Sequence, residues 1–260
     1  MFLRSLLIDS AQLDELKIDG PALCLSSSGK SRQRFPFRRL SQVICIGLPT
    51  EGIDTLFATA NQGIPVSFFN RRGKIIAQLI HPGALPHPLA HWLEASGSDP
   101  LLKEVYQQWL ENQLRHTYAL IGCVARHSRY SAVRAQAQLD KLSKQARCKT
   151  LLDGAREWFE GLLTARLQVH AVRFGLSANS SMLATIIEGL LEAGTLLCLT
   201  WLVLNVRDNG GIPPSRAPFF FEGPLSRSVD EWVARALFTL SNQLEQRALD
   251  QDAPYPEARQ

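Results

Sequence analysis

The stretch that decides the fold is residues 35–80, FPFRRLSQVICIGLPTEGIDTLFATANQGIPVSFFNRRGKIIAQLI. Val43–Ile46 is an unbroken apolar run that ends at Gly47, which predicts a strand buried on both faces. Apolar side chains then recur at helical spacing up to Ala60, so we expect a short helix with Thr50 as its N-cap. Residues 66–69 predict a second apolar strand, which a polar turn connects to a third strand over 74–80.

The polar turn between the last two strands carries two adjacent cations, Arg71 and Arg72, followed by Gly73. Residues at the tip of a hairpin are usually exposed, and arginines there can remain solvated or contact the phosphates of a nucleic acid. Both interpretations stay open from the sequence. Arg71 and Arg72 are therefore candidate DNA-binding residues.

The pattern changes from strands to helices near residues 81–99, where helix breakers concentrate. Asp99 and Pro100 open a long amphipathic helix, and further helices are expected over 130–147, 150–174, 180–206 and 229–249. We therefore predict an α+β protein in four parts. They are an N-terminal β-domain of strands with one short helix (1–82), a linker (83–99), a C-terminal all-helical domain (100–250) and a tail (251–260).

Composition and motif content exclude several cellular locations and protein classes. The N-terminal apolar residues are interrupted by Arg4 and Asp9, which argues against a signal peptide. The charge-free apolar stretch 193–206 is too short to span a bilayer and predicts a buried core helix, so no membrane partner is expected. Five scattered cysteines without a C-x-x-C pair fit a reducing cytoplasm better than secretion and argue against a zinc site. The common nucleotide-binding, zinc-protease and serine-hydrolase motifs are absent.

Positive charge is concentrated in one helical window. The whole chain carries a formal charge of +4, but residues 126–149 hold seven basic residues against one acid, Asp140. The seven are Arg126, Arg129, Arg134, Lys141, Lys144, Arg147 and Lys149. Such a stretch can follow a phosphate backbone, with binding that weakens steeply as salt is added, or it can be an ordinary solvated helix face.

Several spaced elements in residues 2–82 resemble the CRISPR-associated adaptation integrase, the spacer-acquisition protein that inserts foreign DNA segments into a CRISPR array. A first strand ends in Asp, as in Leu6–Asp9, and Pro36, Leu40 and Val43 match a P-x-x-x-L-x-x-V strand entry. Gly63–Phe68 and Arg71–Gly73 match the G-I-P-V-x-F and R-R-G hairpin that follows the helix. The resemblance implies an N-terminal β-domain that dimerises and a helical domain that binds DNA. It also implies a small ferredoxin-like partner that bridges two dimers.

The resemblance also implies a divalent cation, Mg²⁺ or Mn²⁺, held by an early Glu and by a late His and Asp. The early motif, E-G before an aromatic pair, corresponds to Asp153–Phe159. Aligned on the Asp-Gly pair, Asp153 takes the Glu position, but aligned on the aromatic pair the position falls on Leu151. Two residues rotate a helix by roughly 200°, so the alternatives put opposite faces toward the site.

The late ligands are harder to find. No histidine follows His170, and that residue is expected to serve in packing or at the surface. The segment that should carry the late Asp corresponds to Phe219–Arg227, where Glu222 could substitute only if the loop turned it toward the site. The three consecutive phenylalanines at 219–221 look like a plug for a cavity that would otherwise hold a hydrated ion.

Three functions remain open. The leading hypothesis is a DNA-binding subunit of CRISPR adaptation, part of antiviral defence, that is catalytically degenerate and acts as a scaffold; it needs no cofactor. It would form a homodimer through the β-domain, hold double-stranded DNA and pair with other CRISPR proteins in the cytoplasm. The first alternative is an active metal-dependent DNA endonuclease or integrase that uses Mg²⁺ or Mn²⁺ on Asp153, Glu222 and a third ligand. The second is a protein-interaction module that binds no nucleic acid.

Overall fold

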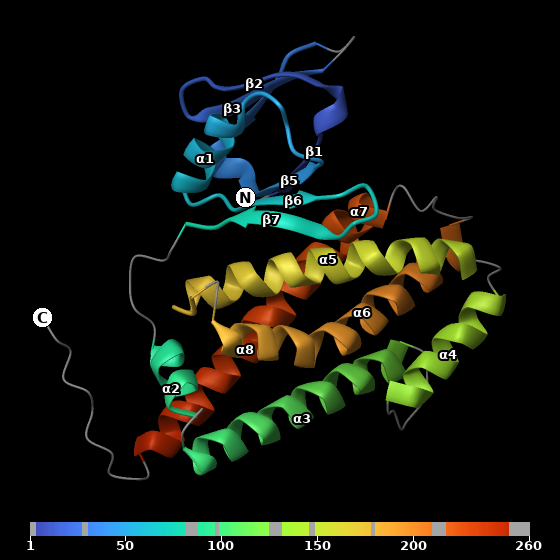
Figure 1. Ribbon diagram of the computed structural model, residues 1–260. Helices are drawn as coiled ribbons and strands as arrows, with labels where there is room; N and C mark the ends of the chain where they lie inside the picture. Colours follow the sequence, from blue (N-terminus) through green and yellow to red (C-terminus); the bar gives the residue numbers. More distant parts are fainter. Residues whose placement is uncertain are drawn as a thin grey trace, which may run out of the picture.

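The computed structural model describes residues 4–27, 31–81, 88–96, 99–124, 132–145, 149–177, 180–209 and 217–249. Strands with one short α-helix make up the N-terminal part and helices the C-terminal part, so the expected α+β class is confirmed. In Figure 1 the strands form the upper layer, and the helices lie below them.

A four-stranded mixed sheet faces the helices. Its strands are ordered β1-β5-β6-β7; β5 pairs in parallel with both β1 and β6, and β7 is antiparallel to β6. The bounds are β1 (Arg4–Asp9), β5 (Leu40–Ile46), β6 (Val66–Phe69) and β7 (Ile75–Leu79). α1 (Ile53–Asn61) makes the crossover that the parallel pair β5 and β6 requires. Thr50 as the N-cap was wrong, because the helix starts after Gly52, whose φ of +79° suits a residue without a side chain.

A second, antiparallel sheet of three strands lies on the far side of the mixed sheet from the helices (Figure 1). The strands are β2 (Leu13–Ile18), β3 (Ala22–Ser27) and β4 (Gln33–Pro36). Two 3₁₀ turns, η1 (Ser10–Gln12) and η2 (Phe37–Arg39), connect this sheet to β1 and β5.

Strand β5 is buried on both faces, as its apolar run predicts. We call the two sheets together with α1 the β-region. Val43 and Cys45 belong to its core, together with Leu23 of the second sheet. Ile44 points the other way and joins the helical core with Phe69 of β6. Successive strand residues alternate between faces, so this one strand contributes to both cores.

The helices follow the expected order. They are α2 (Pro88–Ser96), α3 (Pro100–Val124), α4 (Ala132–Gln145), α5 (Lys149–Arg173), α6 (Ser181–Asn209), α7 (Ala217–Phe220) and α8 (Ser226–Leu249). One π-helical turn, η4 (Phe221–Leu225), joins α7 to α8. α2 lies inside the segment predicted as a linker and buries Leu89, Trp92 and Leu93 in the helical core. The domain limits remain a prediction.

Helix α6 is apolar and long enough over Ser181–Asn205 to cross a membrane by length and composition, but half of its apolar window is buried inside the protein. It packs against α3, α4 and α5. Buried side chains such as Leu190, Leu199 and Val203 join the helical core, as the sequence predicts for a core helix.

Helix α5 forms the contact between the helices and the mixed sheet, and Figure 1 shows it directly beneath β7. The β6–β7 turn rests on this helix through glycines: a Cβ on Gly73 would lie 2.5 Å from the Trp158 Cα, and one on Gly161 would lie 2.0 Å from the Gly73 carbonyl oxygen. Farther along, the Gln78 side-chain amide donates to the Ala165 carbonyl at 3.1 Å. This close approach brings polar side chains of β1 and β5 within reach of α5.

Candidate functional site

A buried arginine on α5 joins two acidic side chains from the C-terminal helices. The Arg166 side chain is only 6% exposed, and its Nη2 donates to Glu222 Oε2 at 2.6 Å. Its Nη1 donates to both oxygens of Asp230, at 3.0 and 3.2 Å. Charge-assisted hydrogen bonds of this kind are the strong ones in proteins. We call Arg166, Glu222, Asp230 and His170 the ion-pair network.

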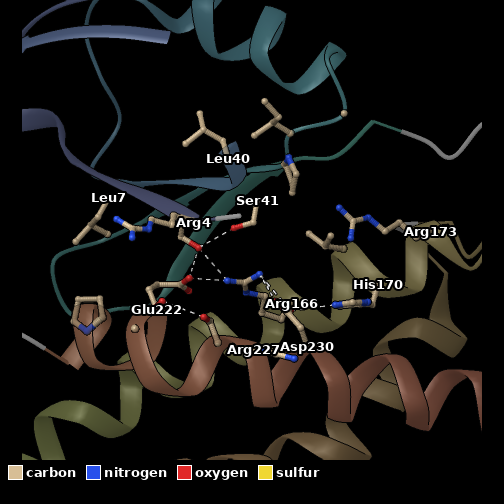
Figure 2. A pocket seen from close by; sticks show the side chains of 18 of the residues that line it. Arg4, Leu7, Leu40, Ser41, Arg166, His170, Arg173, Glu222, Arg227 and Asp230 are labelled. Carbon is tan, nitrogen blue, oxygen red and sulfur yellow. Dashed lines mark hydrogen bonds and ion pairs between the residues drawn. The ribbon is translucent and has the colours of Figure 1, made fainter. Parts of the chain in front are cut away.

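Helical spacing brings these residues together. Arg166, His170 and Arg173 stand at positions i, i+4 and i+7 of α5, so they share one face. Glu222 is followed four residues later by Ser226, whose hydroxyl donates to the Glu222 carbonyl at 3.0 Å, and four residues after that by Asp230. Figure 2 shows α5 and α8 side by side with the network between them.

The mixed sheet supplies neutral partners. The Ser5 hydroxyl of β1 donates to Glu222 Oε2 and accepts from Arg166 Nη2 at 3.1 Å, and it lies 3.2 Å from the Ser41 hydroxyl of β5. The Gln42 side-chain amide donates to Glu222 Oε1 at 3.1 Å. Glu222 is thus bonded to both α5 and the sheet.

Two effects oppose each other on the Glu222 carboxyl. Burial raises the pKa of Glu222 above its ordinary value, because ionising a carboxyl away from water is costly. The charge of Arg166 and the hydrogen bonds from Ser5 and Arg166 act in the opposite direction. Burial is the larger effect, so the carboxylate depends on its partners to remain ionised.

His170, one turn after Arg166 on α5, is the fourth member of the network. Its Nε2 lies 3.1 Å from Asp230 Oδ1, and its side chain is 13% exposed. The sequence analysis expected packing or a surface position for this residue. The structure instead gives it a polar partner.

The ion-pair network forms part of the wall of a cleft between the sheet and the helices. The cleft has a volume of about 1050 Å³. In Figure 2, Arg4 of β1 and Arg173 of α5 lie on opposite sides of it. The cleft can admit a ligand much larger than a single ion.

Asp153, the candidate for the early ligand, lies elsewhere. It is an exposed residue in the first turns of α5. Arg166, which holds Glu222, comes 13 residues later, which corresponds to about 20 Å along the helix axis. The structure therefore does not bring Asp153 and Glu222 together.

The phenylalanine segment is helical and not extended, so the reasoning from alternating side chains does not apply to it. Phe221 is fully buried, with its ring centroid 5.7 Å from that of Phe159, and Phe220 is buried as well. Phe219 is 59% exposed and lines the cleft. Two of the three phenylalanines thus pack in the helical core.

Part of the predicted basic window forms one surface of α4. Arg134, Lys141 and Lys144 are exposed and lie within one side of this helix, opposite the buried Ala135 and Leu139. We call these three residues the α4 basic face. Arg126, Arg129 and Arg147 lie outside the described residues; Lys149 begins α5, and its side chain is not described.

The two arginines of the β6–β7 turn are exposed, as expected. Asn70 holds the turn, because its side-chain oxygen accepts from the backbone N–H groups of Arg72 and Lys74 at 2.9 and 3.0 Å. The tip is docked on α5 through Gly73, which the sequence analysis did not foresee.

Comparison with known proteins identifies the family. A family model described as CRISPR associated protein Cas1 matches residues 9–162, more than half of the 260 residues. The chain belongs to the Cas1 family. The predicted resemblance is therefore confirmed, and membership supports a role related to that of Cas1 in CRISPR adaptation.

Solved structures share the fold of this Cas1 family member at low sequence identity. A Cas1 protein from Thermotoga maritima superimposes with a TM-score of 0.68 at 13% identity, covering 94% of this chain and 97% of that one. A casposase bound to its integration product gives a TM-score of 0.62 at 12% identity, covering 94% and 91%. TtCas1 gives 0.55 at 13% identity, covering 92% and 97%. Comparison with curated proteins finds no match.

The metal that the Cas1 family implies does not fit the described residues. Among them, no group of three His, Cys, Asp or Glu side chains lies close enough to hold an ion. Glu222, Asp230 and His170 are of the ligand types that Mg²⁺ or Mn²⁺ accepts, but the guanidinium of Arg166 already lies between the two carboxylates. A positive side chain in that place opposes a second cation.

Sequence reasoning missed most of the ion-pair network. The spacing of Arg166 and His170 on α5 was a usable signal, because an arginine between the apolar Ala165 and Leu167 needs a partner when the helix is buried. Asp230 was not identified from the sequence as a site residue. Ser5 and Gln42 carried no signal, because their role depends on how the sheet docks.

Proposed function

We propose that this Cas1 family member is a DNA-binding subunit of CRISPR adaptation that is catalytically degenerate and acts as a scaffold. In this proposal it binds double-stranded DNA, forms a homodimer through the β-region and pairs with other CRISPR proteins. The observation that carries the proposal is the pairing of Glu222 with Arg166. Glu222, the acid in the segment expected to supply a metal ligand, is already paired with the guanidinium of Arg166.

Separation of the candidate ligands supports the loss of metal chemistry. Asp153 stands about 20 Å along α5 from the arginine that holds Glu222, so the two carboxylates cannot share one ion.

The exposed cations of α4 support a duplex-binding role. The α4 basic face points away from the buried side of its helix, where it is open to a long anion. Two similar folds were solved with nucleic acid: the casposase with its integration product, and TtCas1 in a DNA complex with a TM-score of 0.50. Their likeness to this chain is in fold, and DNA binding is proposed from the fold and the charge together.

Duplex binding should depend on the α4 basic face. Arg134→Gln, Lys141→Gln and Lys144→Gln together should weaken the binding of a labelled duplex and reduce the slope of log K against log salt by about 2.7, since each lost phosphate contact removes about 0.9. The matched control is Lys103→Gln, an exposed charge on α3. Duplex binding that ignores salt, or an unchanged triple variant, would contradict this role of the α4 basic face. A wild-type protein that binds no duplex would instead favour the protein-interaction module.

An integration assay with Mn²⁺ and a pre-made 3′ end tests the absence of catalysis. We expect no joined or nicked product from the wild-type chain. Product that disappears in Asp153→Ala or Glu222→Gln, with folding intact by circular dichroism, would establish the active enzyme instead.

A further inference from the structure

Two segments of the β-region that are distant from the cleft run side by side and share one surface. They are residues 9–19, which contain η1 and β2, and residues 47–57, which contain the first turns of α1. At one end the Ser10 hydroxyl donates to the Ile46 carbonyl at 2.6 Å, and at the other the Thr55 hydroxyl donates to the Leu16 carbonyl at 3.3 Å. Exposed side chains of both segments are therefore neighbours.

Negative charge dominates these two segments. They hold one base, Lys17, and six acids, which are Asp9, Asp14, Glu15, Asp19, Glu51 and Asp54. Lys17 pairs with Glu15 at 2.7 Å. Among the ion pairs formed between described residues, none involves Glu51 or Asp54, and both are exposed. The surface is thus acidic on a chain whose formal net charge is +4.

Two large apolar side chains are exposed beside these acids. Leu48 is 58% exposed and Phe57 is 50% exposed. Phe57 follows Asp54 by three residues on α1, so the ring and the carboxylate are neighbours on the helix surface. We call Leu48, Glu51, Asp54 and Phe57 the acidic–apolar face. Large apolar side chains that are exposed together within a polar rim are typical of protein interaction sites.

The α4 basic face has the complementary composition. Val133 is 79% exposed and precedes Lys144 by 11 residues, which is close to three helical turns, so the two lie on the same side of α4. An apolar side chain therefore accompanies the cations there as well. In Figure 1, α1 lies at the upper left and α4 at the lower right, at opposite ends of the molecule. The two faces of one chain do not meet.

We infer that the acidic–apolar face binds the α4 basic face of a second copy of this chain. The two faces carry opposite charge, and each offers an exposed apolar side chain for the centre of the contact. Pairing of the acidic–apolar face with itself would bring like charges together, which disfavours a two-fold contact at this surface. The contact is head-to-tail, so its repetition gives a ring or an open row of copies, and it is distinct from a two-fold homodimer.

The head-to-tail contact uses the same cations to which duplex binding is assigned. A copy whose α4 basic face is covered by a neighbour cannot offer it to DNA. Self-association and duplex binding therefore exclude each other at α4. The inference goes beyond the proposed function, because the contact between copies needs no nucleic acid and is tested without it.

Sedimentation velocity of the nuclease-treated full chain tests the contact at about 50 mM and about 0.5 M salt, because salt screens exposed charges. Wild type should form species larger than a dimer at the lower salt, in proportion to concentration, and lose them at the higher salt. Glu51→Lys with Asp54→Lys should abolish them, and so should Lys141→Glu with Lys144→Glu. All four positions are exposed, so both variants should fold, which circular dichroism checks.

An equimolar mixture of the two charge-reversed variants is the decisive measurement. The reversed face of one variant complements the reversed α4 of the other, so the mixture should regain the large species that neither variant forms alone. Phe57→Ser should weaken the association of otherwise unchanged protein about tenfold, as the loss of an interface anchor does. Lys103→Gln is the matched control and should behave as wild type.

Three results would overturn the inference: a wild-type protein whose size does not change with salt, reversed variants that associate alone as wild type does, or a mixture that does not regain association. Duplex binding is measured in a separate titration at low protein concentration. A protein that binds duplex but does not self-associate sinks only this inference, whereas one that self-associates but binds no duplex sinks only the proposed function.

Discussion

Replacement of Arg166 by methionine should be among the most destabilising single changes in this protein. The variant keeps a long apolar stem but removes the cation that neutralises Glu222 and Asp230, whose side chains are 10% and 32% exposed. A charge-assisted hydrogen bond contributes about 1.5–3 kcal/mol, and the partly exposed Asp230 falls at the lower end. The loss of both pairings, and of the bond from Arg166 to Ser5, should cost about 3–5 kcal/mol of unfolding free energy.

The destabilisation caused by Arg166→Met should depend on pH, and its direction follows from the pKa of Glu222. Burial raises the pKa of Glu222, and removal of Arg166 takes away the largest opposing effect. A carboxyl whose folded pKa lies above its unfolded value favours the folded state below the unfolded pKa, and that stability is lost as pH rises through the folded pKa. Arg166→Met should therefore be least stable relative to wild type at about pH 8 and should recover part of the loss at about pH 5.5.

Urea unfolding followed by circular dichroism measures both effects. The matched control is the double variant Arg166→Met with Glu222→Gln, which also removes the stranded carboxylate and keeps its shape. The double variant should be more stable than Arg166→Met alone at about pH 8, with a weaker pH dependence. A cost below about 1 kcal/mol for Arg166→Met, as is typical of exposed pairs, would refute the claim that the pairing is buried and structural.

Gly73→Ala should destabilise the protein by about 2 kcal/mol more than Gly63→Ala in thermal unfolding. Both glycines have positive φ, but only the Cβ added at Gly73 would meet Trp158 of α5, so equal losses would contradict the docking of the turn. Burial raises the pKa of Cys45 and of Cys198 to about 12 each, so both thiols should resist alkylation at about pH 8 until the protein unfolds. Mass spectrometry of the peptides checks this, and labelling of either thiol in the native protein would show that it is accessible.

Much of the fold follows from short-range patterns. The run Val43–Ile46 predicted a doubly buried strand, and the structure distributes its side chains between two cores. The first long helix of the helical region was predicted to begin at Pro100, where α3 begins. The predicted start of α1 was wrong because it depends on the backbone conformation of one residue. Gly52 adopts a positive φ and precedes the helix, so Thr50 does not serve as the N-cap.

The candidate site was harder to predict because it is built from distant segments. Glu222 was identified only through the family motif, and the prediction could not supply its partner, since Arg166 lies 56 residues away. Ser5, 217 residues from Glu222, carries no local signal at all. Such contacts depend on the docking of α5 against the sheet, which no periodicity in the sequence encodes.

The placement of Ile44 and Phe69 in the helical core has a consequence for synthesis of the protein. A nascent chain that has reached the end of β7 still presents that face of its sheet to water, because α5 begins 70 residues later. Contacts so far apart in sequence form slowly, and an uncovered apolar sheet invites association with other chains. Ribosome-bound fragments ending near residue 81 should therefore depend on chaperones, and those that include α5 should be released from that need.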